Sequence, residues 1–159
     1  MASYDLGYLF LAVAIFGKAV WFVNNFPMVF KAKVMGGESQ NLRANMYVYK
    51  QIGSGAGVGA VVLEEEGDVG VYNRANRSMH HMVENMAPLV MSVPLAGFVF
   101  PYPTFVATCV FSVGRVMHMV GYTSKYGKHA LGFVLATFAT EALVGMCALT
   151  GLKALGFMA

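Results

Sequence analysis

The chain has 159 residues, of which 57% are hydrophobic and 12% are charged. Soluble globular proteins carry about 25% charged residues, so the composition argues against a soluble domain. The formal net charge of +3 is modest and lies mostly between the apolar stretches, which gives no support to nucleic-acid binding.

Four stretches of the chain are long and apolar enough to cross a membrane, which takes about 20 helical residues. They predict an all-α membrane protein, a four-transmembrane-helix bundle that forms one domain over residues 1–159. In chain order the expected helices are 7–30, 79–100, 104–122 and 130–158. None shows sustained alternation of polar and apolar residues, which argues against the strands of a membrane barrel.

The connections between the expected helices differ widely in length. Pro101, Tyr102 and Pro103 leave room for only a tight turn, whereas residues 31–76 form a long loop. Residues 52–63 of that loop are rich in glycine but lack the Gly-Lys-Ser/Thr ending of a phosphate-binding loop. We therefore expect a flexible or membrane-skimming segment there.

Lysine and arginine are concentrated in the connections 31–76 and 123–129. Because cytoplasmic loops retain such residues, we expect both connections in the cytoplasm and both termini on the lumenal or outer side. The first residues lack the basic segment of a cleaved signal peptide, so we expect the first helix to be permanent. Cys109 and Cys147 lie inside expected helices, which predicts small packing residues and no disulfide.

Ionisable side chains lie along one face of the second expected helix and one face of the third. They are Arg77, His80, His81 and Glu84 on the second, and Arg115, His118 and Tyr122 on the third. Spacings of three, four and seven place residues on one helical face. A charge inside a span costs about 2.5–3.5 kcal/mol, so we expect the two polar stripes to face each other or a subunit interface.

Single charges also occur in the first and fourth helices. We expect Lys18 to face the bundle interior, where Glu84 or Glu141 could pair with it. Glu141 should be either paired or protonated, because it stands alone in its helix.

Three interpretations of the stripes are open: a neutralised ion network, a metal site, or a site for an anion. The possible metal ligands are His80, His81, Glu84 and His118. Arg77 and Arg115 would repel a divalent cation, so we predict no metal. Two arginines with one glutamate leave a positive excess, which suits an anionic ligand held by bidentate hydrogen bonds.

Both stripes resemble signatures of one known family. Residues 77–85, RSMHHMVEN, look like Arg-Ala-x-x-Asn-x-x-Glu in helix two of the MAPEG family, the membrane-associated proteins in eicosanoid and glutathione metabolism. Residues 115–122, RVMHMVGY, are similar to its second signature, an arginine followed by His or Tyr and then Tyr. The resemblance covers nearly the whole chain.

The resemblance implies a homotrimer in the endoplasmic reticulum or another endomembrane. Glutathione would bind between subunits near the cytoplasmic face, and a lipophilic substrate would enter from the lipid bilayer. Arg77 would bind a carboxylate of glutathione, and Glu84 would bind its γ-glutamyl amine. The other positions expected in the pocket are His81, Arg115, His118 and Tyr122.

Three positions depart from the family pattern. His81 stands where the family has asparagine, and Ser78 where it has alanine. The family's arginine beyond helix three, which helps to hold the glutathione thiolate, is absent. Lys128 or His129 would take its place, with Tyr122 donating a hydrogen bond.

The resemblance thus implies a membrane glutathione transferase or peroxidase, whose thiolate attacks a lipophilic electrophile or a lipid hydroperoxide. The alternative is a non-catalytic accessory subunit or lipid-binding scaffold of a larger membrane complex. The missing arginine and the substituted asparagine favour that alternative, whereas Arg77, Glu84, Arg115 and Tyr122 disfavour it.

Overall fold

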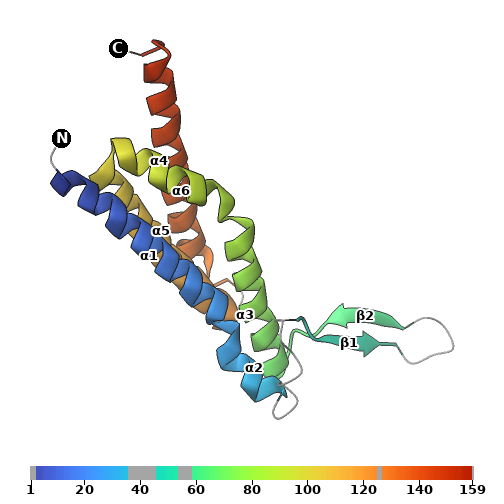
Figure 1. Ribbon diagram of the computed structural model, residues 1–159. Helices are drawn as coiled ribbons and strands as arrows, with labels where there is room; N and C mark the ends of the chain where they lie inside the picture. Colours follow the sequence, from blue (N-terminus) through green and yellow to red (C-terminus); the bar gives the residue numbers. More distant parts are fainter. Residues whose placement is uncertain (1–2, 36–45, 54–58, 125–126, 159) are drawn as a thin grey trace.

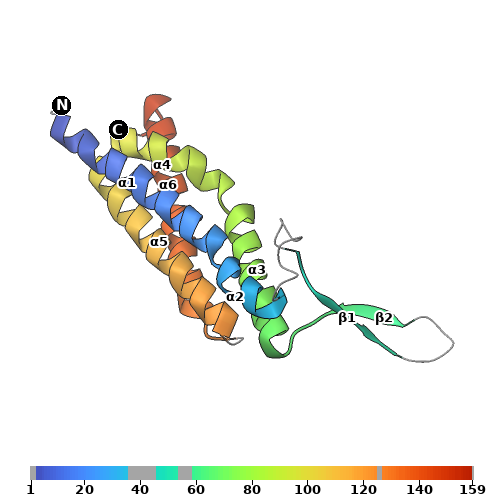
Figure 2. The ribbon, with the colours of Figure 1, turned by 60° about the horizontal axis from the view of Figure 1, so that its bottom comes forward.

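The computed structural model describes residues 3–35, 46–53, 59–124 and 127–158. Within these ranges the elements are α1 (Ser3–Asn25), α2 (Pro27–Met35), β1 (Tyr49–Ile52), β2 (Ala60–Leu63), α3 (Gly67–Glu84), α4 (Ala87–Val99), α5 (Pro101–Ser124) and α6 (Ala130–Ala154). The helices form an elongated bundle, and the β1–β2 hairpin projects from the end opposite both termini (Figures 1 and 2).

Membrane-spanning helices are present much as the sequence predicts. In the described part of the chain, Asp5–Val34, Pro101–Ser124 and Ala130–Ala154 are each long and apolar enough to cross a bilayer. The helices α3 and α4 pass the same test only as a pair, bent by 48°. The described residues therefore form three continuous candidate spans, or up to four if the bent pair of α3 and α4 counts as one span.

The expectation of an unbroken second helix is wrong, because this span breaks after Glu84. Pro88 accounts for the break, since its ring clashes with the carbonyl four residues earlier and it has no N–H to donate. The side chain of Asn85 closes α3 instead, with Nδ2 donating to the His81 carbonyl oxygen at 2.8 Å.

The expectation of a long loop over residues 31–76 is also wrong. Its start belongs to α2 and its end to α3, which begins at Gly67 and not at residue 79. Between them, β1 and β2 pair antiparallel, so the fold is not entirely helical. The glycine-rich run supplies β2, where β-branched valines favour a strand; residues 54–58 of that run lie outside the described residues.

The remaining helix ends differ less from the prediction. Helix α5 starts at Pro101, because proline is well tolerated in the first turn of a helix. One residue, Phe100, separates it from α4, as the tight turn required. Helix α6 ends at Ala154 and not at residue 158.

The side chain of Asn73 fastens the base of the hairpin to α3. Its Nδ2 donates to the carbonyl oxygens of Val48 at 2.7 Å and Glu64 at 2.8 Å. Its Oδ1 accepts from the Val48 N–H at 2.9 Å, and the residue is 1% exposed. The hairpin is thereby held against the helix that carries the first polar stripe.

We expect Asn73→Ala to release the hairpin from α3. The substitution removes three hydrogen bonds, and each buried group left unsatisfied costs about 1–3 kcal/mol. Tryptic cleavage after Lys50 in detergent micelles should therefore accelerate at least about tenfold. The control Glu66→Ala removes an exposed side chain nearby; equal cleavage rates in the two variants would contradict this role of Asn73.

Candidate functional site

The two polar stripes meet between α3 and α5, as their spacing predicts. Arg115 Nη1 lies 3.0 Å from His81 Nδ1, and the ring centroids of His81 and His118 are 5.0 Å apart. A guanidinium group can only donate hydrogen bonds, so Nδ1 of His81 is the acceptor. The proton of this neutral imidazole is therefore on Nε2.

Five rings, which we call the ring cluster, surround this contact: His81, His118, Tyr122, His129 and Phe133. The rings of His118 and Tyr122 stack at 5.7 Å with an interplanar angle of 11°. His129 packs edge-on against both, at 5.3 Å from His118 and 5.0 Å from Tyr122. Phe133 stacks on His81 at 5.9 Å, so the first turns of α6 complete a site that begins on α3 and α5.

Glycines allow α6 to come this close to α5. A Cβ on Gly132 would collide with the backbone N of His118 and lie 2.6 Å from the Gly114 carbonyl oxygen. A Cβ on Gly121 would collide with the carbonyl group of Lys128. Small residues let transmembrane helices approach through their backbones, and here that approach places the start of α6 beside His118.

Two adjoining pockets open at the ring cluster. The first, of about 280 Å³, is lined by Arg77, His81, His118, Tyr122, His129 and Phe133. The second, of about 320 Å³, lies against the hairpin and shares Arg77 and Tyr122 with the first. Small-molecule sites usually span about 300–1,000 Å³, so the two pockets together offer space for a ligand at the hairpin end of the bundle.

Arg115 is a buried cation behind the first pocket, with 3% of its surface exposed. Its Nε contacts Met82 Sδ at 3.4 Å, and its Cζ lies 6.0 Å from the ring centroid of Phe111. Its Nη2 is buried without a hydrogen-bond partner. Among the described residues no carboxylate forms an ion pair with it, and Glu84, which attracts it electrostatically, is itself paired with Arg77. The site therefore carries an excess of positive charge.

The expected binding residues occupy different places in this site. Arg77, His81, His118 and Tyr122 line the first pocket, whereas Arg115 lies behind it and contacts His81. Glu84 lines neither pocket and bonds to Arg77 Nη1 at 2.7 Å, with both side chains about half exposed.

The two candidates for the absent arginine differ clearly. His129 lines the first pocket, and its Nδ1 is buried without a hydrogen-bond partner. Lys128 is exposed and lines neither pocket. The structure thus brings together Tyr122 and His129 and leaves Lys128 aside.

Sequence reasoning missed three aromatic residues of the two pockets, Phe133, Tyr47 and Tyr49. Phe133 follows His129 by four residues, a spacing that indicates a shared helical face and could have suggested it. Tyr47 precedes β1 and carries no such signal. Its hydroxyl lies 2.7 Å from His80 Nδ1, and burial raises the pKa of Tyr47. His80 is thus engaged with Tyr47, outside the ring cluster.

Comparison with known proteins agrees with the architecture. Searches of curated proteins and of solved structures find no match to the chain. The sequence model of the MAPEG family matches residues 8–151, a range that includes both polar stripes and the ring cluster. With its apolar helices, the chain is an integral membrane protein. It belongs to the MAPEG family.

Proposed function

We propose that the protein binds glutathione in the two pockets and acts as a membrane glutathione transferase or peroxidase. The observation that carries the proposal is Arg115, a buried cation with no carboxylate ion pair in the described structure, in contact with His81 of the first pocket. An anionic ligand would supply the missing negative charge. Glutathione has two carboxylates, and membership of the family favours it.

The residues around the pockets suit the polar groups of glutathione. Arg77 lines both pockets, so its guanidinium group is available for a bidentate pair with a carboxylate. His81 has its proton on Nε2 because Arg115 donates to Nδ1. It therefore offers an N–H donor where the family has an asparagine amide. Glu84 lines neither pocket, so its role would be to hold the guanidinium group of Arg77, to which it is bonded at 2.7 Å.

Thiol activation in this proposal depends on Tyr122 and His129. A free thiol has a pKa of about 8.5, so hydrogen bonds to the sulfur would raise the thiolate fraction at neutral pH. Both rings line the first pocket with centroids 5.0 Å apart. A thiolate between them would attack an electrophilic carbon, forming a C–S bond as the leaving group departs with its electron pair.

With a lipid hydroperoxide the same thiolate would attack the terminal peroxide oxygen. The O–O bond breaks, the lipid alkoxide leaves and takes a proton, and the sulfur becomes a sulfenic acid. A second glutathione then displaces water to form the disulfide. Both lipophilic substrates would arrive from the bilayer.

We expect His129→Leu to lower kcat for glutathione conjugation by roughly 100-fold, because it removes a donor at the developing thiolate. Lys128→Met should leave kcat within about twofold, since Lys128 lies outside both pockets. Conjugation of a lipophilic chloroarene in detergent micelles measures both. The opposite ranking would assign activation to Lys128, and glutathione binding without turnover of either substrate class would favour the accessory role.

The proposal includes an orientation and an assembly. Lysine and arginine in 31–76 and 123–129 favour a cytoplasmic position for the hairpin end. Both termini would be lumenal, in the endoplasmic reticulum or another organelle membrane. The family resemblance supports a homotrimer with sites between its subunits.

A further inference from the structure

Two opposite charges lie on the outer surface of the bundle, Lys18 on α1 and Glu141 on α6. Both side chains are exposed, and each is near the middle of an apolar span. The expectation that Lys18 faces the bundle interior is therefore wrong. Charged side chains at such depth are costly in lipid and are normally paired with one another or with backbone carbonyls.

Neither charge has an ionic partner among the described residues of its own chain. The ion pairs formed there join Lys33 to Asp68, Lys50 to Glu64, and Arg77 to Glu84. Lys18 Nζ instead lies 5.9 Å from the ring centroid of Trp21. The main neighbours of α1 are α5, α4 and α3, and those of α6 are α5 and α4. The described part of the chain therefore supplies neither charge with an ionic partner, and a neighbouring molecule in the membrane can supply one.

The two charges lie at similar depths in the membrane. Lys18 lines the same groove as Val113 of α5, and a Cβ on the next residue, Gly114, would lie 2.8 Å from the backbone N of Ala136 in α6. Glu141 is little more than one turn beyond Ala136, about 7 Å along the helix axis. The lysine side chain can cover that offset. Subunits related by a rotation about the membrane normal have each residue at the same depth. Lys18 of one subunit and Glu141 of the next would therefore also lie at similar depths.

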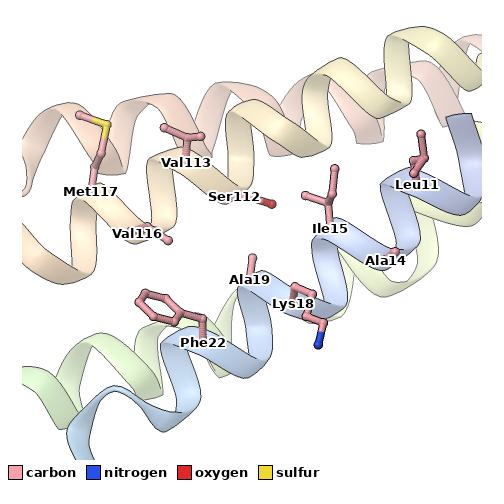
Figure 3. A pocket seen from close by; sticks show the side chains of 10 residues that line it. All are labelled: Leu11, Ala14, Ile15, Lys18, Ala19, Phe22, Ser112, Val113, Val116 and Met117. Atoms are coloured by element: carbon pink, nitrogen blue, oxygen red, sulfur yellow. The ribbon is translucent and has the colours of Figure 1, made fainter. Parts of the chain in front are cut away.

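The surfaces beside the two charges are complementary as well. An apolar groove of about 520 Å³ runs between α1 and α5, lined among others by Ile15, Phe22 and Val116. Figure 3 shows Lys18 at its edge, with the ammonium group directed away from the other lining side chains. On α6, exposed Leu131, Val134, Phe138 and Glu141 follow at helical spacing, and Phe138 is 72% exposed.

We infer that the outer face of α6 in one copy docks on the groove between α1 and α5 in a second copy. Glu141 then forms an ion pair with the second copy's Lys18 inside the bilayer, and Phe138 enters the groove. The two patches are different surfaces, so the contact is heterologous and closes into a ring when a rotation repeats it. This inference is independent of glutathione binding.

Cross-linking of cysteines in differently tagged chains by a bifunctional maleimide tests the contact, because its spacer covers the distance that the long side chains of Lys18 and Glu141 span and a disulfide cannot. One chain carries Lys18→Cys and the other Glu141→Cys, in a background with Cys109 and Cys147 replaced by alanine. Treatment of membranes from cells that express both chains with this reagent should give a dimer with both tags. In the control, the second chain keeps Glu141 and carries Leu152→Cys at the exposed end of α6. This chain should give no two-tag dimer. Absence of the two-tag dimer would overturn the inference. An equal yield of cross-linked dimer from cells that express only one of the two variants would overturn it as well.

Charge exchange gives an independent test of the ion pair. Lys18→Glu or Glu141→Lys alone should raise the dissociation constant of the oligomer at least about tenfold, because like charges then meet. The double variant should restore it to within about threefold of the parent. If both single variants form oligomers as stable as those of the parent, the inference is overturned, and a lipid is then the occupant of the groove between α1 and α5.

Discussion

Gly132→Ala should destabilise the protein, although alanine normally stabilises a helix by about 1 kcal/mol relative to glycine. The added Cβ would collide with the backbone N of His118 and lie 2.6 Å from the Gly114 carbonyl oxygen. Both obstacles are helix backbone, so α5 and α6 would have to separate. Overpacking of this kind costs about 1–3 kcal/mol, and here it would also disturb the ring cluster.

Gly145→Ala is the matched control, because a Cβ at this position of the same helix meets no heavy atom within 4 Å. Its melting temperature should be unchanged or slightly higher, following the helix preference of alanine. In thermal melts followed by circular dichroism in detergent, the two variants should differ by roughly 5–10 °C. Equal melting temperatures would contradict the close approach of α5 and α6.

Arg115→Met should have opposite effects on stability and on binding. Without ligand, Arg115 is a buried charge with no carboxylate partner in the described structure. Replacing buried ionic groups by apolar side chains is often stabilising, by about 1–4 kcal/mol. We therefore expect the ligand-free variant to melt at the same temperature as the parent protein or at a higher one.

The same substitution should weaken glutathione binding. It removes the positive charge behind the pocket and the donor that fixes the tautomer of His81. Interactions of a charged group with its partner contribute about 1.5–3 kcal/mol, so the Kd for glutathione should rise about 10- to 150-fold. Calorimetric titration measures this change, and Arg115→Lys should retain part of the affinity. Lower stability with unchanged affinity would make Arg115 a packing residue only.

Much of the helical architecture could be predicted because the bilayer constrains the chain so strongly. Apolar stretches of sufficient length must be helical to satisfy their backbone, and three continuous spans follow from that rule. The break near Pro88 also had a local signal, since proline removes a hydrogen bond and displaces the preceding turn. The valines of β2 were a local signal for a strand, but the attachment of the hairpin had none, because it depends on Asn73, a residue distant in sequence from Val48.

The candidate site could be predicted only as far as helical periodicity extends. Spacing alone aligns Arg77 with His81, and Arg115 with His118. It cannot distinguish Lys128 from His129, which are adjacent in sequence but differ in position. Their placement depends on the approach of α6 to Gly121 and to His118, which is a tertiary contact. For the same reason the outward position of Lys18 was not foreseen.

Binding of glutathione at the ring cluster is tested most directly by the melting temperature of the purified protein with and without the ligand. A ligand at one hundred times its Kd stabilises the native state by about 2.7 kcal/mol. We expect millimolar glutathione to raise the melting temperature of the parent protein clearly and that of Arg77→Met much less. Glutathione diethyl ester, which lacks both carboxylates, should have little effect on either. No rise with glutathione, or an equal rise with the ester, would contradict an anion site formed by Arg77 and Arg115.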